Sequence, residues 1–277
     1  MSKSRVEYGH VTFPLSLTEQ EKEQYASFCK LNNQTMSGRI KELMRKDMGM
    51  SVLSPFKEGY QLSVINTIRD NKNVIITKSR QMWISTILLS VALENMLTHE
   101  GGVKPYSCMF ICCNNSVANH HIRKFLELCS QNGLKVQEGR LAPNEIYLSN
   151  GAYIRFVSKV PQGVSANIAI FDEFAFNNST TEEEISMLQA CGCKVILSST
   201  PNRGSLFNEI AKGSLLGKNQ YAHVFAHWKM NSVHQANAEV EVSATKDGPI
   251  TCDIVHKTTR SSFNDARYGE EMDCTIL

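Results

Sequence analysis

Two neighbouring carboxylates are the first residues in this sequence that could carry chemistry. Asp172 and Glu173 directly follow the apolar residues 168–171 in the segment NIAIFDEF. An aspartate at the carboxyl end of a buried strand can hold Mg²⁺, and a glutamate beside it can orient and deprotonate an attacking water. The pair alone does not distinguish such a site from two solvated acids at the end of a strand.

A possible partner for these acids lies upstream, in VIITKSRQMWIST (74–86). An apolar strand pattern leads into a short polar loop, and an apolar helical pattern begins near Ser85, which is the layout of a phosphate-binding loop. Aligned with G-x-x-x-x-G-K-[ST], Ser85 takes the hydroxyl position that joins the Mg²⁺ shell, and Ile84 takes the lysine position. Lys78 and Trp83 replace the two glycines, so this segment alone is a poor match.

A third segment, VILSSTPNRG, predicts a buried strand that ends in hydroxyl side chains, among them Ser198, Ser199 and Thr200. Open α/β sheets bind ligands at the carboxyl ends of their strands. Hydroxyls at this edge could sense the γ-phosphate of a nucleotide and relay its loss. The order and spacing of the three segments are more specific than any one of them.

The elements that must position these residues alternate between strand and helix. Near-continuous apolar strands between helices imply a mostly parallel sheet covered on both faces, and the turn Asn150-Gly151 predicts a hairpin. We therefore expect an α/β P-loop NTPase fold with a small N-terminal strand-helix-helix segment. The predicted strands are 74–77, 106–113, 145–158 (the hairpin), 167–176 and 194–204, and the predicted helices are 60–71, 85–97, 116–131 and 182–191.

Composition describes an ordinary globular protein of 277 residues with 42% hydrophobic residues and a net charge of +2, so any contact with nucleic acid requires local patches. The nine cysteines lack metal-site spacing and are predicted to be buried and reduced. His120 and His121 are predicted to be solvated on a helix surface. No signal peptide is recognisable and the longest apolar stretch is too short to span a membrane, so we expect a cytosolic protein.

The first fifty residues differ in character from the rest. They contain a predicted strand and two predicted helices, at 11–17, 18–33 and 38–48. This segment, 1–50, resembles the ribbon-helix-helix family of dimeric DNA-binding proteins, in which two strands pair across the dimer and enter the major groove. The resemblance implies that Thr12 and Ser16 face DNA. A small helical hairpin that packs on the main domain is the alternative.

The rest of the chain, 51–277, resembles the ATPase domain of the large terminase subunit of tailed double-stranded DNA viruses. The resemblance begins near residue 56 and rests on PFKEGYQLSVINTI as the adenine-side segment, KSRQMWIST as a deviant Walker A loop, IAIFDEFAF as Walker B and LSSTPNRGSLFNEI as the coupling motif. The final segment, ARYGEEMDCTIL, is similar to the end of that family's ATPase region.

The resemblance implies roles for individual residues. Many members carry K-x-R-Q-x-G-[KI]-S-T, and in those with isoleucine the phosphate-binding lysine stands at the start of the loop, which here is Lys78 with Arg80 nearby. Glu173 is the implied catalytic base, and Gln61 matches the residue that reads the adenine edge. Mg²⁺ is expected at Ser85 and Asp172. The implied ATP contacts are Gln61, Lys78, Ser79, Arg80, Gln81, Met82, Trp83, Ile84, Ser85, Thr86, Ser199 and Thr200.

Three departures from the family pattern alter these expectations. Trp83 stands where the loop has a glycine, and a bulky side chain resists positive φ and crowds the approach to phosphate. An arginine often precedes the glycine upstream of Walker B, whereas this chain has Gln162, so another residue must supply that charge. Members usually continue into a nuclease domain, and since this sequence stops at Leu277 we expect nuclease activity to lie on another chain or outside the given sequence.

The resemblance implies a motor that hydrolyses ATP with Mg²⁺ and drives double-stranded DNA into a preformed capsid. Its partners would be the portal protein, the small terminase subunit and further copies in a ring, in the cytoplasm of an infected bacterial host. One alternative is a DNA-binding or assembly subunit in which Trp83 fills the phosphate site and the fold is only a scaffold. Another is a helicase-like ATPase, which the absence of recognisable helicase motifs after residue 204 disfavours.

Overall fold

The computed structural model describes residues 3–8, 11–16, 18–31, 52–53, 55–99, 105–138, 144–235, 238–243, 251–256, 274 and 276. Its strands are β1 (Lys3–Tyr8), β2 (Val11–Ser16), β3 (Asn73–Lys78), β4 (Ser107–Ile111), β5 (Val136–Glu138), β6 (Glu145–Leu148), β7 (Tyr153–Val157), β8 (Ile168–Asp172), β9 (Lys194–Ser199), β10 (Ala222–Ala226), β11 (Ala238–Ser243) and β12 (Thr251–His256). Its helices are α1 (Glu19–Leu31), α3 (Gly59–Asp70), α4 (Ile84–Thr98), α5 (Asn115–Gln131), α6 (Glu182–Ala190), α7 (Leu206–Leu215) and α8 (Ser232–Gln235), with the short 3-10 helices η1 (Phe174–Phe176) and η2 (Trp228–Met230). The predicted helix at 38–48 and most of the final segment, 266–277, lie outside the described residues.

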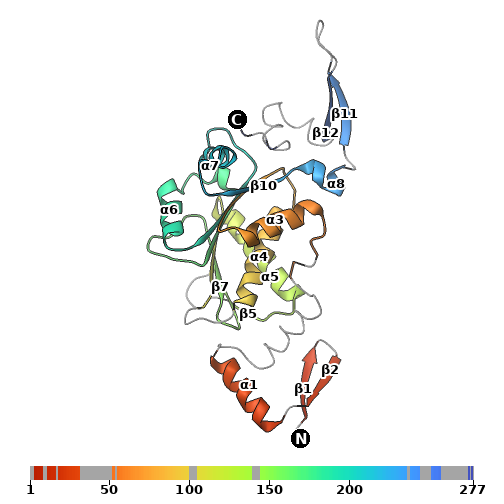
Figure 1. Cartoon of the computed structure of the whole chain (residues 1–277), viewed down its shortest axis with the longest axis vertical. Coiled ribbons are helices and arrows are strands. Elements are labelled where there is room, and N and C mark those ends of the chain that lie inside the picture. The colour runs from red at the N-terminus through yellow and green to blue at the C-terminus, as the bar shows by residue number, and fades with distance from the viewer. Residues whose placement is uncertain are drawn as a thin grey trace.

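One eight-stranded sheet organises the described part of the chain, in the order β10-β3-β9-β8-β4-β7-β6-β5 (Figure 1). All neighbours from β10 to β7 are parallel, and β6 and β5 extend the sheet antiparallel. The predicted hairpin is confirmed as β6 and β7, and Gly151 in its turn has φ 83°, a conformation that glycine adopts without strain. The expected mostly parallel α/β fold is therefore confirmed.

The helices cover both faces because the chain reverses its direction across the sheet. It passes from β3 through α4 to β4 and through α5 toward β7, and then returns by β8, α6, β9 and α7 to β10. Right-handed crossovers made in opposite directions place their helices on opposite faces. Accordingly α3, α4 and α5 lie on one face, and α6 and α7 on the other (Figure 1).

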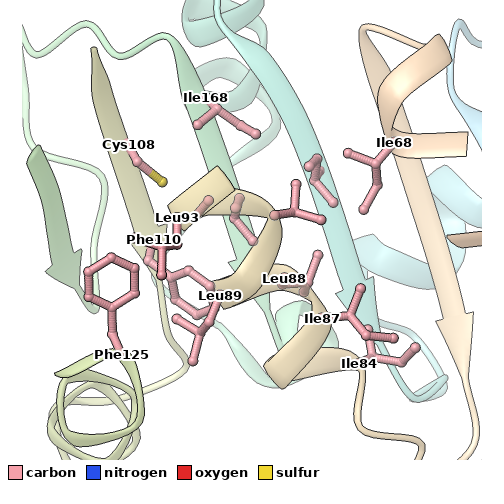
Figure 2. Close-up of a cluster of buried hydrophobic side chains, with 14 of the residues drawn as sticks. Ile68, Ile84, Ile87, Leu88, Leu89, Leu93, Cys108, Phe110, Phe125 and Ile168 are labelled. Carbon is pink, nitrogen blue, oxygen red and sulfur yellow. The ribbon is translucent and has the colours of Figure 1, made fainter. Parts of the chain in front are cut away.

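Alternate residues of the central strands feed two separate cores. In β3, Val74 and Ile76 face the layer of α3, α4 and α5, whereas Ile75 faces the layer of α6 and α7. Figure 2 shows the first layer, where α4 packs its leucines and isoleucines between Ile68 of α3 and Phe110 of β4. Because α4 is buried on nearly all sides, the loop that precedes it is fixed at the edge of the sheet.

Helix α4 is strongly apolar, but it contains only 15 residues. In the portion of the chain that the structure describes, no helix combines the length and the hydropathy that a membrane span requires. The apolar side chains of α4 are packed in the core of the protein.

Some elements differ from the sequence-based expectation. The strand predicted at 167–176 ends at Asp172, because Glu173 has φ 54° and turns the chain into η1. Helix α7 and strand β10 were not predicted, although β10 is the neighbour of β3. Five of the described cysteines are buried, as expected, whereas Cys113 is half-buried and Cys191 is exposed.

The N-terminal strand and first helix match β2 and α1. However, β2 pairs with β1 of the same chain, with Thr12 opposite Glu7 and Ser16 opposite Lys3. In ribbon-helix-helix proteins the partner strand comes from a second chain, so this pairing gives that resemblance no support. Contacts of Thr12 and Ser16 with DNA remain a prediction.

Candidate nucleotide-binding site

Three neighbouring strands deliver the predicted segments to one edge of the sheet. In the parallel register, Thr77 of β3 lies opposite Ser199 of β9, and Ser198 of β9 lies opposite Asp172 of β8. The loop that starts at Lys78, the hydroxyls at the end of β9 and the acids at the end of β8 therefore meet where parallel α/β sheets bind ligands. The sequence placed these segments in order, and the strand order makes them adjacent.

The loop between β3 and α4 keeps a left-handed turn without glycine. Gln81 has φ 58°, and Trp83, the residue that caps α4, has φ 59° and ψ 12°. The N-cap residue Trp83 makes no side-chain hydrogen bond to this end of α4. The first N–H groups of the helix, which carry partial positive charge, therefore receive no acceptor from their cap residue. The Trp83 indole is 62% exposed, so its bulk is directed largely toward solvent.

The predicted phosphate-binding lysine contacts the predicted catalytic base. Lys78 Nζ lies 2.6 Å from Glu173 Oε1, and the exposed fractions of the two side chains are 6% and 31%. Such a short, largely buried pair is a charge-assisted hydrogen bond. The left-handed backbone of Glu173 aims its side chain back toward the loop at this point.

Asp172 is buried at the centre of the site, where His121 Nε2 of α5 lies 3.0 Å from its Oδ2. Burial raises the pKa of the Asp172 carboxyl, but the neighbouring His121, the charge of Lys78 and the nearby Ser85 hydroxyl together outweigh burial. The pKa of Asp172 is therefore lowered, and the group is a carboxylate. The placement of Ser85 beside Asp172 fits the expected hydroxyl and carboxylate pair.

The prediction that His121 is solvated was wrong, whereas His120 is exposed. His121 shares the buried face of α5 with Ala118 and Phe125. These positions are three and four residues from it, so helical periodicity could have revealed its burial. Its proximity to Asp172 was not readable, because it depends on how α5 packs against the sheet.

The hydroxyl of Ser199, the last residue of β9, contacts the segment that follows Glu173. Ser199 Oγ accepts a hydrogen bond from the Ala175 N–H at 3.2 Å, and Asn202 donates to the Ala175 carbonyl at 3.3 Å. Thr200 is buried next to Ser199. The coupling motif is thus bonded to the short helix η1 that begins beside the candidate base.

A cavity of about 440 Å³ adjoins the loop on the side of α3. Gln61 lines it, and its Oε1 accepts from the N–H groups of Lys57 and Glu58 at 3.0 and 3.1 Å. The cavity is also lined by Tyr60, Trp83, Thr86 and Asn231. The volume lies in the range of small-molecule sites, and one wall is an exposed aromatic ring suited to stacking.

The remaining predicted loop residues differ in burial. Met82 and Ile84 are core residues, Ser79 is buried, Ser85 and Thr86 are half-buried, and Arg80 and Gln81 are exposed. Ser79 Oγ accepts from the Trp228 N–H at 2.8 Å, so it anchors the start of the loop. Tyr60 and Asn231 are further buried polar residues of this region that the sequence reading did not select.

The donor set fits Mg²⁺ bound together with a nucleotide. Within the described ranges, no group of three or more His, Cys, Asp or Glu side chains could hold a metal ion. Mg²⁺ in phosphoryl-transfer sites needs only one or two carboxylates, because phosphates and water complete its shell. Asp172 with Ser85 beside it supplies such a partial set.

Comparison with known proteins identifies the fold. No protein-family model matches this sequence, and no curated protein matches it. The ATPase domain of the large terminase of Thermus phage P74-26 aligns with a TM-score of 0.60 and 14% identity, over 82% of this chain and 96% of that domain. This chain has the large terminase ATPase fold.

Two further large terminases align less completely. One, from a thermophilic bacteriophage and solved in complex with ADP, gives a TM-score of 0.56 at 13% identity over 79% of this chain and 53% of its own. The large terminase of bacteriophage HK97 gives 0.51 at 13% identity over 70% and 41%. This chain matches about half of each of these longer terminases.

Proposed function

We propose that this protein is the ATP-hydrolysing subunit of a DNA-packaging motor. The observation that carries the proposal is the meeting of Lys78, Ser85, Asp172 and Glu173 at one edge of a terminase-type sheet, beside the uncapped start of α4. Each of these groups matches a need of phosphoryl transfer, and a cavity of about 440 Å³ is lined by Trp83 and Thr86, which lie on either side of Ser85 in the sequence.

Within this proposal each side chain has a separate task. Lys78 and the N–H groups at the start of α4 bind the phosphates of ATP. Ser85 and Asp172 provide oxygen ligands, and bound Mg²⁺ neutralises charge on the phosphates. Glu173 orients the attacking water and accepts its proton. Gln61 and the cavity beside Trp83 receive the adenine.

The ion pair between Lys78 and Glu173 gives the cycle a defined order. The bond from the Lys78 ammonium to Glu173 Oε1, at 2.6 Å, competes with any hydrogen bond between this carboxylate and an attacking water. Incoming phosphates compete with Glu173 for Lys78. Nucleotide binding therefore releases the base at the moment when its substrate is present.

The motor activity adds partners that are proposed by analogy with the large terminases. These are double-stranded DNA, a portal protein, a small terminase subunit, a ring of identical subunits and a separate nuclease chain. A neighbouring subunit of the ring would supply the arginine that Gln162 does not provide. The N-terminal segment, with Thr12 and Ser16, would contact DNA. The place of action would be the cytoplasm of an infected bacterial cell.

The test is Mg²⁺-dependent ATP hydrolysis by the purified chain, with and without double-stranded DNA. Glu173→Gln removes the base and is expected to reduce turnover by about 10²-fold or more. Glu127→Gln, an exposed carboxylate on α5, is the matched control and should leave turnover unchanged. Turnover that survives Glu173→Gln would refute the assigned base. Absence of both turnover and nucleotide binding in the wild type would instead support the DNA-binding or assembly subunit.

A further inference from the structure

The phosphate loop needs an external support, because two of its residues have unfavourable backbone conformations. Gln81 and Trp83 both have φ near 60°. An L residue is disfavoured in this region, because its Cβ comes close to the following carbonyl oxygen. Such conformations persist only where neighbouring contacts determine them. The residue between them, Met82, is 1% exposed, and its backbone carbonyl accepts a hydrogen bond that can hold the loop.

That contact is a hydrogen bond from Tyr60 of α3. Its hydroxyl donates to the Met82 carbonyl at 3.2 Å, and it accepts from Gln61 Nε2 and from Asn231 Nδ2, both at 3.3 Å. A phenol has one donor and two acceptor sites, so these three bonds use its full capacity. Tyr60 and Asn231 are 3% and 2% exposed, which protects the bonds from competition by water.

The Tyr60 hydroxyl joins three parts of the chain that are distant in sequence. Gln61 belongs to α3, Met82 to the loop, and Asn231 lies between η2 and α8. A second bond holds the same junction, since the Glu58 carboxylate accepts from the N–H and hydroxyl of Ser232 at 3.3 and 3.1 Å. The support of the loop is therefore also one wall of the adjoining cavity.

The direction of one peptide group follows from this support. A trans peptide points its C=O and N–H in opposite directions. With the Met82 carbonyl held toward Tyr60, the N–H of Trp83 is held on the side of the loop away from Tyr60. A phosphate loop works through N–H groups that are fixed before the anion arrives.

We infer that Tyr60, held by Asn231, is a positioning residue that fixes the phosphate loop for nucleotide binding. The inference rests on the proposed function, and it adds two residues to which the Walker-type segments assign no role. Tyr60 acts on binding, through the backbone of Met82 and Trp83, and it does not touch the candidate base Glu173. Its loss should therefore change affinity and leave the chemical step intact.

The experiment compares Tyr60→Phe with Tyr221→Phe. Tyr60→Phe removes only the hydroxyl and keeps the buried ring. Tyr221 is a matched control, because its hydroxyl accepts one hydrogen bond from Gln189 in a separate cavity. ADP affinity is measured by calorimetry, and KM and kcat for ATP are measured in parallel. Tyr60→Phe should weaken ADP binding and raise KM by about tenfold, with kcat within about twofold of the wild type.

Fluorescence supplies a readout that needs no nucleotide. The chain has two tryptophans, Trp83 at 62% exposure and Trp228 at 0%, so acrylamide quenches mainly Trp83. Releasing the Met82 carbonyl should change the quenching constant of Trp83 in ligand-free Tyr60→Phe and not in Tyr221→Phe. The quenching constant is compared among the three proteins before any ligand is added.

The outcomes separate this inference from the proposed function. Wild-type ADP affinity and unchanged quenching in Tyr60→Phe would overturn the positioning role. Equal loss of affinity in both tyrosine variants would also overturn it, because a general loss of stability would then suffice. If the wild type binds no nucleotide, the proposed function fails. Quenching alone then decides whether Tyr60 holds the loop.

Discussion

The left-handed backbone of Trp83 predicts which of two variants at this position has the higher unfolding free energy. Trp83→Gly and Trp83→Ala both remove the indole and differ only in the residue's tolerance of φ 59°. Alanine pays about 1–2 kcal/mol in this conformation, whereas glycine adopts it freely but loses about 0.5–1 kcal/mol through the greater entropy of its unfolded chain. The glycine variant should therefore be more stable by about 0.5–1 kcal/mol.

Urea unfolding measures this difference. At an m-value of about 3 kcal/mol/M the two midpoints should be separated by roughly 0.2–0.3 M, with equal m-values. Glu127, an exposed residue in the right-handed helix α5, provides a control of opposite sign. The unfolding free energy of Glu127→Ala should be higher than that of Glu127→Gly by about 1 kcal/mol. An alanine variant at position 83 that equals or exceeds the glycine variant would refute the left-handed loop.

Three further predictions concern buried polar groups. Burial lowers the pKa of His223 to about 4, below the value of about 6.5 for a histidine in the unfolded chain. The neutral ring therefore contributes its full stability above pH 6.5, and this contribution is lost as the pH falls toward 4. Because His223 is partly exposed, this contribution is discounted: between pH 7 and 5 the wild type should lose about 1–2 kcal/mol more unfolding free energy than His223→Gln. Equal losses of the two proteins in urea titrations would contradict this prediction. His121→Ala removes a buried side chain that contacts the Asp172 carboxylate and should lower unfolding free energy by about 3 kcal/mol, and a loss below about 1 kcal/mol would argue against the pair. Ser199→Ala removes the acceptor of the Ala175 N–H and should cost about 1–2 kcal/mol in the same assay, whereas no change would show that this bond is dispensable.

Local sequence patterns were sufficient for most of the sheet. The apolar runs that became β3, β8 and β9 are continuous because both faces of these strands are buried, and the turn at Asn150-Gly151 determined its hairpin through local backbone preference. These strands and this turn are determined by residues that are close together in the sequence, so they can be predicted from the sequence alone. Strand β10 was missed, and helix α7 was missed although Ser205 caps it and Phe207, Ile210 and Ala211 follow helical spacing.

The chain by itself determined which groups are available for chemistry. Ser85 lies at the start of the helix in a strand-loop-helix pattern, and Asp172 and Glu173 directly follow an apolar run. Both patterns are local, so the sequence reveals them. Tertiary structure decided how these groups combine. The bond between Lys78 and Glu173 spans 95 positions, and the bond between Tyr60 and Asn231 spans 171, so no local periodicity encodes either one. Both bonds exist because the strand order and the packing of α3 and η2 bring these segments to one edge of the sheet, where burial excludes the water that would otherwise compete for them.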